Sequence, residues 1–390
     1  MDKPSTIVFM VPDYEPTTGG TTRQTRNLAL TLTSQGHHVT VITQRLERAW
    51  SVTETIEGID VVRLGPPSRR GLSMKLLVLH VALWLRLNRK RIVVSTTIMY
   101  PDFVVAAHAA GIADTAVMVW AGLGDATDTL ALNQSRARNA LARLRRRALR
   151  CASHIALSKS ISDELQGLNF GVSPHVIPTP VDPGMFSPPE PAQRDAARSS
   201  LGIAPSTLVV LYAGHLRALK RVDLLIEAFR QLCDSGTEAH LFILGGSRED
   251  LQDRTEQLQI LVSKLKLDRH VTFTGVVSDV VEYFHAADVF ALPSDREGIS
   301  NSLIEALACG LPCIAPPSAG GLEVLDASCG VVPPSNDSRD LFAALQSVCD
   351  PDVRARMRIG AVTAAKRYEL DTIAQQYVWL YEGIRAQYIG

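Results

Sequence analysis

Two carboxylates in the segment 294–321 are placed where they could act on a polar ligand. Glu297 lies in a predicted polar loop, and Glu305 lies in the apolar helical run that follows it. A strand pattern precedes the loop, while Gly310 and Pro312 end the helix. The N–H groups at a helix N-terminus can hold a phosphate, and nearby carboxylates can accept hydrogen bonds from hydroxyls. The segment therefore predicts a site for a nucleotide diphosphate that carries a sugar.

A plainer interpretation of Glu305 has to be weighed against this one. The four residues from Ser302 to Glu305 also fit a capping box, in which Glu305 would only bond back to the helix cap. Short motifs of this kind often match by chance. Glu297, however, lies outside the helix, and Gly320 and Gly321 follow soon after the tight helix exit. We therefore favour the ligand-binding interpretation.

At its full length, the segment 294–321 resembles the donor-binding signature of the family 4 retaining glycosyltransferases, which have the GT-B fold. The resemblance implies that Glu297 contacts the donor sugar and acts in catalysis, while Glu305 holds the donor ribose. It also implies donor contacts for Asn301, Ser302 and Leu303, where the loop leads into the helical run.

A second candidate element, residues 213–229, runs from a strand into a helix. Its plain interpretation is a polar loop followed by an amphipathic helix. Its functional interpretation gives Lys220 a catalytic role, because a fixed cation stabilises the charge that grows on a departing diphosphate. The element resembles the family's G-R-L…K-G pattern, with Gly214 and Lys220 in register.

Two residues of this element depart from the family pattern. His215 stands where the family has an arginine, and Arg221 stands where the family has a glycine. A protonated histidine can donate to phosphate, but it titrates where an arginine does not. Arg217 or Arg221 could supply the missing charge. We expect Gly214, His215 and Arg217 to bind the donor beside Lys220.

Two loops of the first half are further candidates. Gly19 and Gly20 lie in a Thr/Gly loop, where backbone N–H groups can approach a phosphate closely, although a simple turn is the alternative. The resemblance implies that this loop closes over the donor. Where the family often has a histidine, this chain has Asp125 and Asp128. Asp125 or Asp128 could activate the acceptor hydroxyl or bond to the sugar, and a loop or capping role is the alternative.

The loops 244–247 and 274–279 each follow a predicted strand. In open α/β sheets, ligands bind beyond the carboxyl ends of the strands, so both loops lie at the expected edge. The resemblance implies that they line the nucleotide base pocket, with Val276 and Val277 close to the base.

Short Val- and Ile-rich strands alternate with helices throughout the chain, which predicts parallel sheets covered on both faces. Strands are predicted near the segments 6–12, 37–43, 59–64, 91–97, 115–121, 154–158, 207–214, 239–245, 271–275, 288–293, 312–315 and 330–332. The predicted fold class is α/β with two doubly wound domains. The resemblance makes them the Rossmann-like domains of a GT-B fold, which face each other across a cleft that would hold the site.

Length and proline content predict the domain boundary. The 390 residues are too many for one core. Six prolines in the stretch 175–191 mark a stiff linker. We therefore expect one domain over 1–180 and another over 181–370, and the resemblance implies that the first binds the acceptor and the second binds the donor. The resemblance implies that the C-terminal helix, within 371–390, packs back on the first domain.

The remaining composition predicts a chain without disulfides or membrane spans. The six cysteines follow no metal or disulfide spacing and are interpreted as small core residues in a reducing compartment. The N-terminus has no secretory signal pattern. The most apolar stretch, Leu76 to Leu85, is too short to cross a bilayer and predicts a packed helix. These patterns predict a cytoplasmic protein.

The net charge is zero, but residues 1–181 hold 21 Lys and Arg against 13 Asp and Glu, a surplus of eight positive charges. Seven arginines and no acid lie in the segment 136–150. The segment fits either a solvated helix face or a basic helix that docks on an anionic membrane. The second alternative would place the enzyme on the inner face of the cell membrane.

The predicted function is the transfer of a sugar from a nucleotide-diphosphate sugar to a hydroxyl of a glycan, a glycolipid or a cell-envelope polysaccharide precursor. The resemblance implies retention of anomeric configuration. A sugar-nucleotide epimerase or phosphorylase, or an inactive nucleotide-sugar-binding protein, is the alternative. The one D-x-D sequence, Asp350 to Asp352, is interpreted as a turn, so we expect no metal and no cofactor. Nothing in the sequence indicates a nucleic-acid partner.

Overall fold

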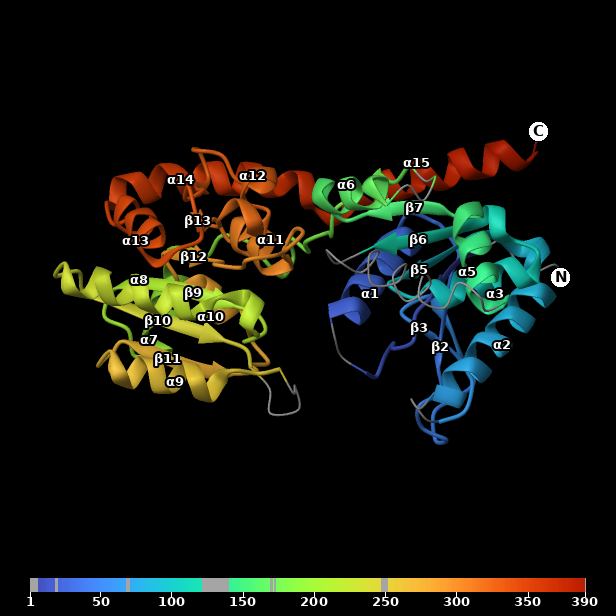
Figure 1. The fold of residues 1–390 in the computed structure, drawn as a ribbon, viewed down its shortest axis with the longest axis horizontal. Helices are drawn as coiled ribbons and strands as arrows, with labels where there is room; N and C mark the ends of the chain where they lie inside the picture. The colour runs from blue at the N-terminus through green and yellow to red at the C-terminus, as the bar shows by residue number, and fades with distance from the viewer. Residues whose placement is uncertain are drawn as a thin grey trace. The chain divides into compact units, whose positions relative to one another are not determined.

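The computed structural model describes residues 6–17, 20–67, 71–120, 140–168, 171, 173–246 and 252–389. The chain divides into two compact units (Figure 1). One comprises Met1–Pro180 together with Leu370–Gly390, and the other comprises Val181–Glu369. The division at Pro180 falls inside the proline-rich stretch 175–191.

The first unit is built on a sheet with the strand order β3-β4-β2-β1-β5-β6-β7-β8 in the described residues. Neighbouring strands are parallel, except that β3 pairs antiparallel with β4. The strands are β1 Thr6–Met10, β2 Val39–Gln44, β3 Thr53–Ile56, β4 Ile59–Leu64, β5 Ile92–Ile98, β6 Ala116–Trp120, β7 Ser153–Ala156 and β8 His175–Val176.

Helices form layers on this sheet. Contacts join α2 to α3 and α3 to α5 in one layer, and α1 to α15 in another. The helices are α1 Gly20–Ser34, α2 Gly71–Asn88, α3 Pro101–Ala110, α5 Ala140–Cys151, α6 Lys159–Gly167 and α15 Leu370–Ile389, with 3-10 turns η1 Arg89–Arg91 and η2 Ala113–Thr115. The C-terminal helix α15 contacts β5, and the Tyr381 hydroxyl shares a hydrogen bond of 2.7 Å with the Thr96 hydroxyl.

The second unit has a sheet with the order β11-β10-β9-β12-β13-β14, all neighbours being parallel. Its strands are β9 Leu208–Ala213, β10 Ala239–Leu244, β11 Val271–Gly275, β12 Val289–Ala291, β13 Cys313–Ile314 and β14 Gly330–Val331. Two parallel-sheet α/β domains in one chain confirm the predicted fold class.

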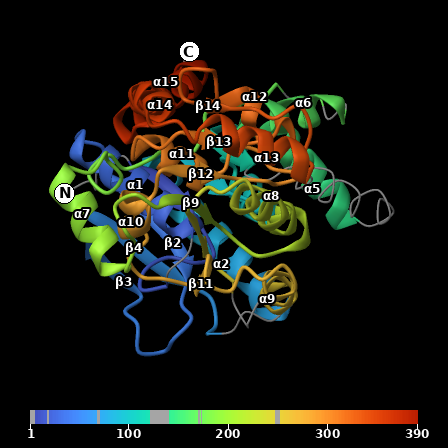
Figure 2. The same cartoon turned by 90° about the vertical axis from the view of Figure 1, so that its left-hand side faces the viewer.

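Helices cover this second sheet as well (Figure 2). Contacts join α13 and α9 to α8, α10 to α7, and α14 to α11. The helices are α7 Pro191–Ser200, α8 Val222–Asp234, α9 Thr255–Lys264, α10 Val281–Ala286, α11 Asn301–Ala308, α12 Gly321–Val324, α13 Ser338–Ser347 and α14 Pro351–Ala365, with 3-10 turns η3 Ala218–Lys220, η4 Pro317–Ala319 and η5 Lys366–Tyr368. Asp350 caps α14 by accepting from the Asp352 N–H at 2.8 Å, so the D-x-D sequence is a helix start, where a turn was expected.

Two strands were not predicted. The strand β3 is a polar, exposed segment that turns into β4 at Glu57 and Gly58, both with positive φ. It carries no apolar alternation that would indicate a strand. The strand β8 is two residues long and lies within the predicted linker. One cysteine also differs from its prediction, because Cys151 is exposed, while Cys309, Cys313 and Cys329 are buried.

Candidate functional site

Two loops of the second unit that were predicted to bind the donor meet at the carboxyl ends of β9 and β12. The Asp295 N–H donates to the Leu219 carbonyl oxygen at 2.9 Å. The Arg221 guanidinium contacts the Asp295 carboxylate at 3.1 Å. Asn336 joins them from a third loop, donating to the Pro293 carbonyl oxygen and to Asp295. The loops are therefore tied together by both backbone and side-chain bonds.

Lys220 and Glu297 form an ion pair across these two loops. Both side chains are largely shielded from water, at 20% and 22% exposure. In such a setting an unpaired charge would be costly, so each side chain stabilises the other. Their motifs predicted separate roles for these two residues, and the structure brings them into direct contact. A diphosphate that reaches Lys220 would therefore also alter the surroundings of Glu297.

The backbone conformation at Arg221 is one that favours glycine, the residue that the resembled family pattern has at this position. Arg221 has φ 47°, in the left-handed region, where a side chain costs about 1 to 2 kcal/mol. Its guanidinium bonds to Asp223 and Asp295. The bond to Asp223, followed by that to Asp295, raises the pKa of Arg221. Arg221 is thus bound to two carboxylates, which makes it a poor source of the second donor-binding charge.

The helix α11 begins in a way that excludes the capping box at Ser302. Ser300 is the N-cap residue, with extended backbone, and Ser302 lies inside the helix. Glu305 is therefore beyond the third helical position that a capping box requires. The first turn holds no acidic side chain, and the Ser300 hydroxyl bonds to the Ser302 hydroxyl at 3.0 Å instead of capping. This helix end is suited to an anion.

Gly320 and Gly321 serve close packing beneath the Glu297 loop. A Cβ atom at Gly320 would collide with the Gly298 carbonyl oxygen, and one at Gly321 would collide with the Ala315 carbonyl oxygen. The Glu297 N–H donates to the Ser318 carbonyl oxygen at 3.0 Å in the same region. The glycine pair therefore helps to fix the backbone that carries Glu297.

Three glycines bring the remaining second-unit loops together. A Cβ at Gly245 would collide with the Gly214 carbonyl oxygen, and the Gly245 N–H donates to the Gly275 carbonyl oxygen at 2.9 Å. The loops after β9, β10 and β11 thus touch at one edge of the sheet. Val276, next to Gly275, is 77% exposed, and Val277 is half-buried.

Tyr212 is a residue of this region that sequence reasoning missed. Its hydroxyl donates to the His215 carbonyl oxygen at 2.7 Å and so fixes the start of the Lys220 loop. Burial, with a smaller contribution from the negative charge of Glu297, raises the pKa of Tyr212. An aromatic residue at the end of a buried strand gave no signal that distinguished it from core. His215 and Arg217 themselves have exposed side chains.

The first-unit candidates are only partly described. Gly20 opens α1, while Gly19, Asp125 and Asp128 lie outside the described residues. The arrangement of these residues relative to the donor therefore stays a prediction.

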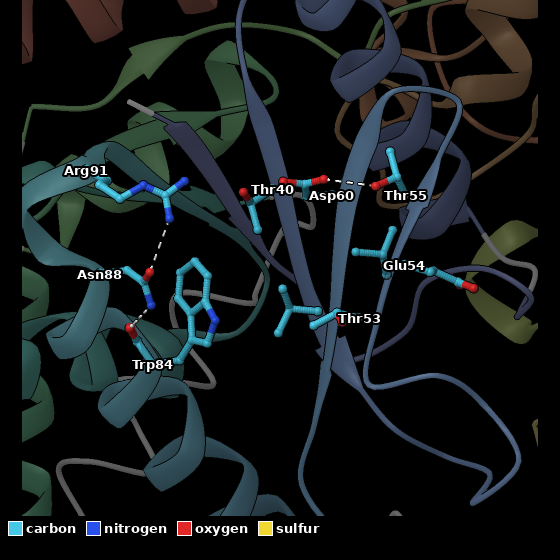
Figure 3. Close-up of a pocket in the computed structure, with 10 residues that line it drawn as sticks. Thr40, Thr53, Glu54, Thr55, Asp60, Trp84, Asn88 and Arg91 are labelled. Atoms are coloured by element: carbon cyan, nitrogen blue, oxygen red, sulfur yellow. Dashed lines mark hydrogen bonds between the residues drawn. The ribbon is translucent and has the colours of Figure 1, made fainter. Parts of the chain in front are cut away.

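A separate polar cavity of about 360 Å³ lies in the first unit (Figure 3). The Trp84 ring and the side chains of Asn88 and Arg91 face Thr40 and Asp60 across it. Thr40 and Asp60 stand near the amino ends of β2 and β4. The cavity is therefore at the edge of the sheet opposite to the one where ligand loops are expected.

In the described parts of the chain, no three His, Cys, Asp or Glu side chains converge as possible metal ligands. Nor does any helix among those residues have the length and apolar character that crossing a bilayer would need.

Comparison with protein families matches both units. The model for glycosyl transferases group 1 matches residues 193–362, which include the Lys220 and Glu297 loops. The model for glycosyltransferase family 4 matches residues 18–184. The chain therefore contains a domain of each of these two glycosyltransferase families.

Curated relatives include two D-inositol 3-phosphate glycosyltransferases. That of Xylanimonas cellulosilytica is 32% identical over 217 residues, which are 53% of this chain and 50% of the relative. That of Saccharomonospora viridis is 31% identical over 239 residues, which are 59% of this chain and 55% of the relative. The chain thus matches about half the length of these glycosyltransferases.

Solved structures of glycosyltransferases match nearly the whole chain. Sucrose-phosphate synthase from Thermosynechococcus elongatus has a TM-score of 0.77 at 22% identity, covering 98% of this chain and 100% of that one. HepE of Anabaena, in complex with UDP and glucose, has a TM-score of 0.73 at 20% identity, covering 96% and 99%. WaaG, a glycosyltransferase involved in lipopolysaccharide biosynthesis, has a TM-score of 0.71 at 21% identity, covering 97% and 100%. These similarities confirm the GT-B fold.

Proposed function

We propose that this glycosyltransferase moves a sugar from a nucleotide-diphosphate sugar to a hydroxyl acceptor, with retention of anomeric configuration. The observation that carries the proposal is the Lys220–Glu297 ion pair, held where the loops after β9 and β12 meet. A cation and a carboxylate side by side suit a ligand that presents a diphosphate next to sugar hydroxyls. Family membership supports the same reaction.

Each site residue has a distinct role in this proposal. Lys220 stabilises the negative charge that grows on the leaving diphosphate, and the N-terminus of α11 contributes its N–H groups to the same charge. Glu297, released from Lys220, accepts hydrogen bonds from the sugar hydroxyls. Glu305 does the same for the ribose. No enzyme nucleophile is assigned.

The proposed reaction needs no divalent metal, because Lys220 and the α11 N-terminus supply the positive charge that the diphosphate requires. Assay in excess EDTA tests this directly. The rate is expected to be unchanged. A rate that EDTA abolishes and Mg²⁺ or Mn²⁺ restores would contradict the role of Lys220 as the main counter-charge.

The acceptor is proposed to be a hydroxyl on a glycan, a glycolipid or a cell-envelope polysaccharide precursor. Relatives named for inositol 3-phosphate support a polar, hydroxyl-rich acceptor. The complex of HepE with UDP and glucose supports testing uridine-diphosphate sugars first as donors. The first unit is proposed to bind the acceptor.

We further place the enzyme on the cytoplasmic face of a membrane, where a lipid-linked acceptor would be presented. The basic helix α5 supports this location, because Arg143, Arg147 and Arg150 are exposed on it. Its apolar side is partly used for packing, since Leu149 is buried. Arg145 is bound to Asp102 of α3 and belongs to the fold rather than to the free surface.

Thermal-shift measurement with UDP, GDP, ADP and their sugars tests donor binding. A ligand that binds the folded state raises the midpoint of unfolding according to its affinity. One nucleotide and its sugar are expected to raise it, and slow hydrolysis of that sugar nucleotide should accompany binding. Binding without any turnover would instead favour an inactive nucleotide-sugar-binding protein.

A further inference from the structure

The helix α2 has an exposed row of leucines that packing among the described residues does not explain. Leu79 is 62% exposed, Leu83 is 54% exposed and Leu87 is 76% exposed, with Leu76 at 37% beside them. The sequence predicts a packed helix for the stretch 76–85. That prediction is wrong for one face, which remains open to solvent.

The spacing of these leucines puts them on one side of the helix. Steps of three and four residues, as between Leu76, Leu79, Leu83 and Leu87, follow the helical repeat. The buried side chains Leu77, Val81 and Leu85 follow the same repeat on the inner side. At about 1.5 Å per residue, the exposed row is about 16 Å long. We call Leu76, Leu79, Leu83 and Leu87 the leucine stripe.

Positive charge surrounds the leucine stripe. Between Asp60 and Asp102 the sequence contains no acidic residue and eight basic ones. Those with exposed side chains near the stripe are Lys75, Arg86, Arg89 and Lys90. The helix α3 contacts both α2 and α5, so the exposed arginines of α5 belong to the same helical layer (Figure 1).

An apolar row bordered by cations, in a stretch that has no acid between Asp60 and Asp102, matches an anionic membrane surface. Leucines can enter the boundary between headgroups and acyl chains, while Lys and Arg remain at the headgroup phosphates. A second copy of the chain is a poor occupant, because it would bring two basic surfaces together. An exposed apolar patch on a folded protein is also expected to have an occupant.

We propose that the leucine stripe of α2 is the part of this protein that inserts into an anionic membrane, and that the basic residues of α2, η1 and α5 orient it there. The inference deepens the proposed membrane location, and it rests on that part of the proposed function. Binding through arginines alone would weaken as the salt concentration rises. The leucine stripe would add a hydrophobic contribution that persists at high salt.

Co-sedimentation with vesicles of phosphatidylglycerol and phosphatidylcholine tests the proposal on the full chain. The variant Leu79→Ser/Leu83→Ser/Leu87→Ser is expected to bind these vesicles at least tenfold more weakly than wild type. The matched control, Ile260→Ser/Ile359→Ser, removes two exposed apolar side chains of the second unit and should bind like wild type. Binding by the stripe variant at wild-type strength would overturn the proposal.

The salt dependence separates the two components. The variant Arg143→Glu/Arg147→Glu/Arg150→Glu should lose the salt-sensitive part of binding, whereas the stripe variant should lose the part that persists at high salt. A Leu83→Trp variant should add a fluorescence signal that brominated lipids quench. Absence of that quenching in vesicle-bound protein, or a wild-type dimer that the stripe variant converts to monomer, would contradict membrane insertion.

Failure of this inference can be told apart from failure of the proposed reaction. The stripe variant should bind and hydrolyse a soluble nucleotide sugar like wild type, because α2 belongs to the first unit and the Lys220–Glu297 ion pair belongs to the second. Its thermal midpoint should also be preserved, since the exchanged side chains face solvent. If the wild-type protein binds vesicles but turns over no donor, the proposed reaction is refuted, while the proposed membrane-binding role of the leucine stripe still stands.

Discussion

The two units share a parallel-sheet architecture, yet they present their candidate functional residues differently. In the second unit these residues lie in loops beyond the strand ends, tied by bonds such as Asp295 to Leu219 and Lys220 to Glu297. In the first unit the most distinctive groups lie on outer helix faces, as with Leu83 of α2 and Arg147 of α5. Tied loops suit chemistry, which needs fixed geometry, whereas exposed faces suit contact with a large partner.

Replacing Lys220 should have the largest effect on turnover, and it tests whether the tied loops of the second unit carry out the chemistry. Turnover by Lys220→Ala is expected to fall about a hundredfold or more, because one well-placed donor to developing charge contributes that much. The control Lys264→Ala removes an exposed lysine of α9 and should leave the rate unchanged. Activity of Lys220→Ala within a few-fold of wild type would remove Lys220 from the mechanism.

Acidification should weaken the first unit through His154, which anchors α5. The His154 ring accepts from the Trp120 Nε1–H at 2.8 Å and pairs with the Leu149 carbonyl oxygen at 2.8 Å. Burial lowers the pKa of His154 to about 4, against 6.5 for an exposed histidine. Below pH 6.5 the His154 ring binds a proton in the unfolded chain, whereas in the folded chain it stays neutral down to about pH 4. The free energy of unfolding should therefore fall over this window, by on the order of 3 kcal/mol.

Denaturant titration of wild type and His154→Gln between pH 7 and pH 4 measures this effect. The variant should lack this part of the pH dependence, whatever its stability at pH 7. The difference between the two proteins isolates His154 from the other titrating groups. Parallel stability curves for the two proteins would contradict the assignment.

The two glutamates should separate binding from turnover. Glu305→Gln is expected to weaken nucleotide binding, while Glu297→Gln mainly lowers turnover, each by about tenfold to a hundredfold, since charge-assisted hydrogen bonds contribute about 1.5 to 3 kcal/mol. Calorimetry with the nucleotide and steady-state kinetics measure these two quantities. Wild-type behaviour of both variants would remove the carboxylates from the donor site.

Replacing Arg221 should have the smallest effect, which is on folding stability, and it tests whether the backbone of the tied loop is strained at this residue. Arg221→Ala loses the contacts to Asp223 and Asp295 and keeps the left-handed strain, whereas Arg221→Gly loses the same contacts and relieves the strain. Arg221→Gly should therefore be more stable than Arg221→Ala by about 1 kcal/mol. Chemical denaturation measures the difference. An Arg221→Ala variant of equal or greater stability would show that the backbone there is unstrained.

The sequence predicted most of the fold because its strands are short apolar runs between helices. The predicted strand 271–275 has the bounds of β11, for example. The prediction from sequence missed β3, whose residues are polar and exposed. An edge hairpin without a buried face lacks the alternation of apolar and polar residues that indicates a strand. The C-terminal helix, expected from family resemblance within 371–390, is α15, Leu370–Ile389.

The candidate site was predictable in part. Lys220 and Glu297 could be singled out from their motifs, but no sequence window contains both, so their ion pair required the structure. The close packing of Gly320 against Gly298 could not be predicted either, because the two residues are also far apart in the sequence. In α2, leucines occur on several sides of the helix, so the sequence could not indicate which of them would stay exposed.

The measurement that tests the central proposal most directly is proton NMR of a nucleotide sugar during turnover by the wild-type protein, with and without an acceptor. The account predicts that the donor anomeric signal is replaced by a product signal of the same configuration, and that Lys220→Ala slows the exchange about a hundredfold. A product of inverted configuration would contradict retention. A full panel of nucleotide sugars that remains unconsumed would contradict sugar transfer itself.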